Sequence, residues 1–187
     1  MESNQAPENP DDPGSALAVA NQTRQRLAAS LRLPTGFYPK LAAAIAVQVG
    51  TAAFGIASQT PAGLVVALAG VAFFLAVAAL LLRQFRRTNG VKVDGLASQI
   101  VLGSAITSTL IYVAAIGVAT WAAFASRWWL VAVASGVGGV GYAYGVVRWW
   151  HAYQLDPAPR AGGASSRVLV ALAVVAVAGL AVLLIAG

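Results

Sequence analysis

The side chains able to do acid–base or metal chemistry are few in this chain. It has no Cys and one His, so disulfide frameworks and zinc sites built from Cys/His clusters are excluded by count. Three candidates lie outside the acidic N-terminal stretch: Asp94, His151 and Asp156. Catalysis needs ionisable groups that converge, whereas anchoring at lipid headgroups explains His151 equally well, because Trp149 and Trp150 precede it. We predict no catalytic, cofactor-binding or metal-binding residue and a chain that is not an enzyme.

A literal G-x-G-x-x-G occurs at residues 136–141. That dinucleotide-binding motif works only where a strand turns into a helix, with an acidic residue about 20 positions later. Here the glycines lie in an apolar run, and alanine occupies the position of the acid. Close helix packing explains them better, because Gly lets helix backbones approach within lipid. Gly141 with Gly145 and Ser135 with Gly139 have the small-xxx-small spacing, and the partner helix could be internal or belong to another copy.

A second small-residue face is predicted in the first apolar run, where Ala42, Ala46 and Gly50 recur every four residues. Mildly polar side chains near it and in the third run could face one another. They would line a path or pocket for a neutral solute, or simply bond between helices, which is the interpretation we favour. These residues are Gln48, Ser104, Thr107, Ser108 and Tyr112.

Three arginines, Arg83, Arg86 and Arg87, share one helix face because they are spaced i, i+3 and i+4, and Lys92 extends the patch. The patch could bind an anionic lipid headgroup or an acidic partner loop. It also serves as a topology signal, which we regard as the simpler explanation.

The elements that must position these residues belong to a membrane. Of the 187 residues, 59% are hydrophobic and 10% charged, and the mean hydropathy is +0.75; an ordinary soluble domain has about 25% charged residues. Backbone groups in lipid must be satisfied within helices or closed barrels, and these runs are too long and uniform for barrel strands. The predicted fold is therefore an all-α integral membrane bundle of five transmembrane helices.

The domain boundaries follow from charge-free runs of about 20 residues or more. A polar break at Ser58–Pro61 divides the first long run, and Ser126–Arg127 separates the third span from the fourth. No span contains Asp, Glu, Lys, Arg or His. The predicted spans are 41–57, 62–82, 100–124 and 128–147 in a four-helix region 41–147, then a flexible cytoplasmic loop 148–167 and a fifth helix 168–187.

The N-terminal segment has two predicted parts. Residues 1–14 carry three Pro and four acidic residues, which predicts a disordered tail and no signal peptide. Residues 15–40 form an amphipathic or interfacial lead-in, whose helical part could lie on an anionic leaflet or be solvated. Pro34 and Pro39 are expected to break any helix before the first span.

Positive charge predicts the orientation. The N-terminal region and the second loop each carry four Lys or Arg and the fourth loop three, whereas the other side has only Arg127. Because such excess marks the cytoplasmic side, we expect the N-terminus inside and the C-terminus outside. This partition also explains the net charge of +6 without a nucleic-acid partner.

The segments Leu33–Lys40, Arg86–Val91 and Asp94–Leu96, with the Ala, Val and Gly bias, resemble small uncharacterised multi-pass proteins of actinobacterial type over about residues 33–100. The resemblance implies a bacterial inner-membrane setting and no activity. The leading hypothesis is a non-enzymatic helix-packing module or accessory subunit, with the bilayer, anionic lipids and a membrane-protein partner or second copy as partners. The alternative is a small oligomeric transporter or channel for a neutral or lipophilic solute.

Overall fold

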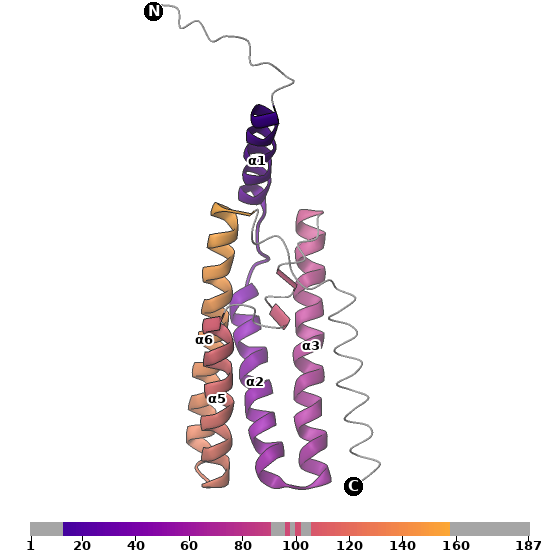
Figure 1. The fold of residues 1–187 in the computed structure, drawn as a ribbon. Coiled ribbons are helices and arrows are strands. Elements are labelled where there is room, and N and C mark those ends of the chain that lie inside the picture. The colour runs from indigo at the N-terminus through magenta and orange to yellow at the C-terminus, as the bar shows by residue number, and fades with distance from the viewer. Residues whose placement is uncertain (1–12, 91–95, 98–99, 102–105, 158–187) are drawn as a thin grey trace, which may run out of the picture.

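The computed structural model describes residues 13–90, 96–97, 100–101 and 106–157. Within these ranges the chain forms helices and no strands, so the predicted all-α class is confirmed. The five helices, labelled as in Figure 1, are α1 (Pro13–Ser30), α2 (Phe37–Ser58), α3 (Pro61–Asn89), α5 (Ile106–Phe124) and α6 (Trp128–Leu155).

Local sequence signals set the boundaries of the α2–α3 hairpin. Helix α2 begins after Gly36, which has φ +73°, and ends before Gln59, which is also left-handed at φ 49°. Helix α3 begins with Pro61. Proline lacks a backbone N–H, but no hydrogen bond is lost here, because N–H groups in the first turn of a helix have no intrahelical acceptor. The Thr60 side chain caps this helix by accepting a 3.1 Å hydrogen bond from the backbone N–H of Gly63.

The α5–α6 hairpin turns through three residues. Helix α5 ends in a Schellman motif, in which Arg127 N donates to Ala122 O at 2.9 Å and Ser126 N donates to Ala123 O at 3.0 Å. Ser126 adopts the left-handed conformation that this motif requires, with φ 57°. The motif pairs the carbonyls of Ala122 and Ala123, which would otherwise lack a partner at the helix end.

Helix α2 lies at the centre of the bundle, with α3 on one side and the α5–α6 pair on the other (Figure 1). Its core face recurs at three- and four-residue spacing, as expected for a helix in contact with neighbours. The fully buried members of that face are Leu41, Ala44, Ile45, Val49 and Ala53.

Three of the described helices, α2, α3 and α6, are long and apolar enough to cross a membrane, by length and composition. The prediction of five spans is therefore supported only in part. The apolar part of α5 is shorter, Ser108–Phe124, and residues 102–105 of the predicted third span lie outside the described residues. The predicted fifth helix, 168–187, lies outside them as well, as do the tail 1–12 and residues 158–167 of the predicted loop.

The predicted lead-in is divided by a short non-helical segment. Helix α1 continues beyond the end of the bundle where α3 and α6 finish, instead of lying across it (Figure 1). The expectation that Pro39 breaks the helix is wrong, because Pro39 lies in the first turn of α2. First-turn N–H groups have no intrahelical acceptor, so proline is tolerated there.

Candidate functional site

The small residues of α2 and α6 meet closely. A methyl group added at Gly139 would overlap the backbone carbonyl oxygen of Ala42 and come within 3.2 Å of the Ala46 side chain. One turn away, a methyl at Gly50 would lie 3.5 Å from the Ser135 Oγ. The structure therefore brings together the two small-residue faces that the sequence places on separate spans.

The glycines on the neighbouring face of α6 contact α5. A methyl group at Gly141 would lie 2.7 Å from the Ile111 side chain, and one at Gly145 would overlap Ser108 Oγ. Gly138 similarly lies against Ala115. The sequence leaves open whether the helix facing Gly141 and Gly145 is internal, and in the structure it is α5 of the same chain.

A third seam, between α2 and α3, is not among the sequence-predicted sites. A methyl group at Gly55 would lie 2.5 Å from the Gly63 carbonyl oxygen, and one at Gly70 would overlap Thr51. The seven-residue spacing of Gly63 and Gly70 is the signal that could have found it, because residues seven apart share a helix face.

The predicted polar path is only partly brought together. Ser108 is completely buried against Gly145, and Tyr112 is half-buried with its ring 6.0 Å from that of Tyr142. Gln48 is half-buried on α2. Ser104 lies outside the described residues, and the side chain of Thr107 does as well. Around Ser108 the structure shows a close helix contact.

Several buried oxygens in this region have no hydrogen-bond partner among the described residues: Gln48 Oε1, Ser108 Oγ, Thr120 Oγ1 and Ser135 Oγ. The buried Tyr142 differs, because its hydroxyl donates a 2.9 Å hydrogen bond to the carbonyl of Ile100. An unpaired buried oxygen costs about 1–3 kcal/mol. These four groups are therefore the polar features of the interior that packing alone does not explain.

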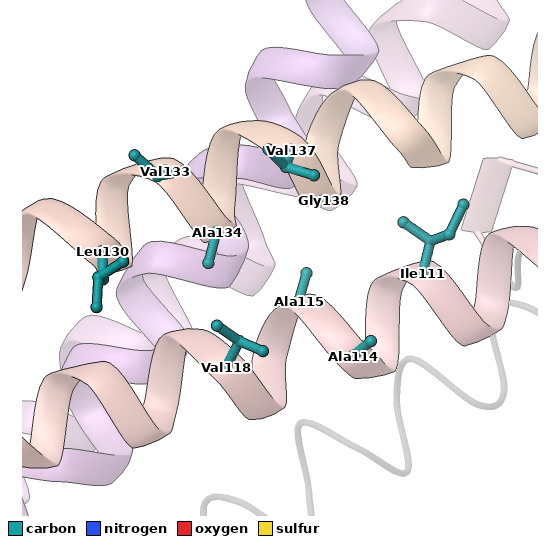
Figure 2. Close-up of a pocket in the computed structure, with 9 residues that line it drawn as sticks. All are labelled: Ile111, Ala114, Ala115, Val118, Leu130, Val133, Ala134, Val137 and Gly138. Carbon is teal, nitrogen blue, oxygen red and sulfur yellow. The ribbon is translucent and has the colours of Figure 1, made fainter.

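An apolar groove of about 330 Å³ runs between α5 and α6 on the outside of the bundle. Figure 2 shows Ala115 and Val118 of α5 pointing toward α6, and Ala134 of α6 pointing toward α5, with α2 behind them. Val133 and Val137 on its rim are more than half exposed. The lining residues are Ile111, Ala114, Ala115, Val118, Leu130, Val133, Ala134, Val137 and Gly138.

The candidate chemical residues do not assemble into a catalytic or metal centre in the described part of the chain. His151 is exposed near the end of α6, Asp156 caps that helix, and Asp94 lies outside the described residues. No group of three or more His, Cys, Asp or Glu that could hold a metal occurs in the described ranges. Residues 136–141 lie inside the continuous helix α6, so they cannot form a dinucleotide-binding turn.

The basic patch lies on the last turns of α3. Arg83, Arg86 and Arg87 are exposed and together border a hollow of about 590 Å³, whereas Lys92 lies outside the described residues. The other described residues that line this hollow are Ala79, Leu82 and Gly90.

The opposite side of this helix end is firmly anchored. The Asn89 side chain accepts a 2.8 Å hydrogen bond from Arg32 N and donates to the carbonyls of Arg32, at 2.8 Å, and Phe85, at 3.0 Å. The buried Phe85 ring packs edge-to-face on Trp150 of α6, with 5.8 Å between centroids. This Asn89 clasp was not predicted. An Asn directly before the helix-ending Gly90 is the signal that could have indicated it.

Comparisons of the chain with protein-family models, with curated proteins and with solved structures find no match. The function must therefore be argued from the chain's own helices, contacts and charges.

Proposed function

We propose that this chain is a multi-pass protein of a bacterial cytoplasmic membrane that acts without catalysis, as a module or subunit that packs against a partner. The single observation that carries the proposal is the contrast between a closed interior and an open apolar groove. Glycine contacts close the interior of the described bundle, and the groove between α5 and α6 stays open on its outside. A protein built in this way offers its surface, not its interior, for function.

The occupant we propose for the groove is a transmembrane helix of a partner protein. The groove runs between two helices and is lined by apolar side chains, so a third helix could lay a ridge of side chains into it. Ala114 and Ala134 line it with small side chains, which leave room for the side chains of another helix. Small residues of this kind favour close approach of helices in lipid, where no hydrophobic drive brings them together.

The groove is tested by filling it. We expect Ala114→Phe with Ala134→Phe to abolish recovery of a stoichiometric partner from native-lipid discs, as measured by mass spectrometry of the retained proteins. Val113→Phe with Ala132→Phe is the matched control, because both residues are exposed on the same two helices and neither lines the groove. If the filled variant and the control retain the same partner equally, the groove is not its binding site.

For topology, we propose five crossings with the N-terminus cytoplasmic and the C-terminus outside. The support is the distribution of positive charge, which favours the end where Arg83, Arg86 and Arg148 lie. The chain has no Cys, which suits it to cysteine labelling. Gln59→Cys should react with an impermeant reagent from outside, and Thr88→Cys only after the inner face is exposed. The opposite pattern would reverse the orientation.

A second candidate function is an oligomeric transporter or channel for a neutral or lipophilic solute. It is favoured by the buried oxygens without partners, among them those of Gln48, Ser108 and Ser135. Under this hypothesis, Gln48→Leu with Ser135→Ala should reduce solute flux into vesicles, and recovery of the protein alone as a homo-oligomer would support it. Undiminished flux in that variant would remove those residues from the path.

A further inference from the structure

The hollow beside the last turns of α3 combines positive charge with an apolar floor. Its described lining forms one stripe of the helix, with Ala79 and Leu82 on the side of the apolar span and the three arginines toward the helix end. The stripe therefore changes from apolar to cationic within a few turns, which complements the change from apolar tails to an anionic headgroup along a lipid molecule. The hollow has a volume of about 590 Å³ and is open on its outer side.

Among the described residues, little negative charge is available to compensate this stripe. The described residues contain a single carboxylate, Asp156, which caps α6. The C-terminal end of the α3 dipole favours basic residues, but that effect is about 0.3–1 kcal/mol for an exposed group. Three guanidinium groups spaced i, i+3 and i+4 repel one another, so an anion bound among them would relieve the repulsion.

The stripe is also held in place before any ligand arrives. The Asn89 clasp and the Phe85–Trp150 contact fix the opposite side of the same turns to the segment after α1 and to α6. Gly90 caps the C-terminal end of α3, and its N–H donates a 2.8 Å hydrogen bond to Arg86 O. Such preorganisation reduces the entropy that binding must overcome.

We propose that this hollow is a binding site for the phosphate of an anionic phospholipid, with Arg83, Arg86 and Arg87 around the headgroup and the acyl chains along Ala79 and Leu82. The planar guanidinium group presents a fork of donors that matches phosphate oxygens. A topology signal alone would require only positive charge. The three arginines have in addition a hollow that continues from charged into apolar side chains, and Arg24 and Arg26 of helix α1 do not line it.

The test uses the full-length protein in neutral detergent, titrated with phosphatidylglycerol or phosphatidylcholine. We expect native mass spectrometry to show retained phosphatidylglycerol on the wild type, and thermal unfolding to shift upward with this lipid and not with phosphatidylcholine. Each basic side chain near an anionic surface contributes about 1 kcal/mol, so Arg83→Gln with Arg86→Gln and Arg87→Gln should weaken binding on the order of 100-fold. The matched control, Arg24→Gln with Arg26→Gln and Arg148→Gln, removes the same charge elsewhere and should bind as the wild type does.

A second variant protects the test against misfolding or misinsertion. Arg83→Lys with Arg86→Lys and Arg87→Lys keeps the charge and the topology signal but removes the forked donors, and it should bind more weakly than wild type while unfolding at the same temperature without lipid. Equal binding by wild type, the Gln variant and the Lys variant would overturn the proposal. Stabilisation by inorganic phosphate equal to that by phosphatidylglycerol would also overturn it, because the site would then bind a free anion and not a lipid.

Discussion

The two sides of α6 show how differently one glycine-rich sequence is used. On the inner side, Gly139 lies against the backbone of Ala42 and Gly145 against Ser108, so neither position has room for a side chain. On the outer side, a methyl group added at Gly136 would meet no atom within 4 Å, and its neighbours Val140 and Tyr144 are exposed. Glycines of one motif thus have opposite environments, and only the tertiary contacts distinguish them.

This difference indicates where the fold is specified and where it is open to change. The inner contacts fix how near α2, α5 and α6 can approach, since a helix pair in lipid depends on close van der Waals contact. The outer surface has no such constraint within the described chain. We therefore expect substitutions to change sign between the two sides of the same helix.

The largest effect is expected at Gly139. Gly139→Leu would force α6 away from α2, because the obstacle is the Ala42 backbone and not a side chain that can rotate. We expect a loss of more than about 3 kcal/mol in the free energy of unfolding, measured by SDS denaturation in mixed micelles. Gly136→Leu is the control and should stay near wild type. Equal losses at both positions would remove the distinction between the two sides.

A smaller loss is expected at Gly145, where the obstacle is a side chain. Gly145→Ala should cost about 1–3 kcal/mol, because its methyl group would overlap the completely buried Ser108. Adding Ser108→Gly should return part of this stability, with a coupling between the two changes of about 1 kcal/mol or more in a double-mutant cycle. Strict additivity would show that these two residues do not meet.

Replacing the two tyrosines on opposite sides of α6 should change the free energy of unfolding by amounts that differ by about the value of one hydrogen bond. Tyr142→Phe removes the bond to the Ile100 carbonyl and should destabilise the protein by about 1 kcal/mol. Tyr144→Phe should change the free energy of unfolding little, because this side chain is 64% exposed. The same denaturation assay compares them, and a larger loss at Tyr144 would contradict the comparison.

The smallest expected effect has the opposite sign. Gly136→Ala introduces a better helix former into open space and should stabilise α6 by up to about 1 kcal/mol. The same substitution at Gly139 should destabilise it, since the added methyl group would overlap Ala42. If both substitutions stabilise, the α2–α6 contact is looser than described.

Much of the helical architecture could be predicted from sequence, because long charge-free runs leave few alternatives in lipid. Gln59 and Ser126, which lie at the two tight turns, fall in the breaks that the sequence marks. The count of spans is another matter. Length and composition assign three crossing helices within the described residues, where five were expected over the whole chain. Pro39 was misjudged because a proline's effect depends on its position within the turn.

The candidate sites were harder to predict, because spacing identifies a helix face but not its neighbour. Small-xxx-small spacing picked out Gly141 and Gly145, yet it could not say that α5 covers them. Ser108 looked like part of a polar path, and only its contact with Gly145 shows how tightly that place is closed. The groove between α5 and α6 and the hollow beside α3 both depend on which residues the fold brings together. A local sequence pattern does not contain that information.

The Asn89 clasp carries a consequence for the order of events during synthesis. It joins Asn89 to Arg32, 57 positions earlier in the chain. Chains emerge from the ribosome N-terminus first, so the N–H and carbonyl of Arg32 stay without this partner until the whole of α3 has been made. The clasp can form only after both helices of the α2–α3 hairpin have been synthesised. Its formation therefore reports that the first hairpin is complete.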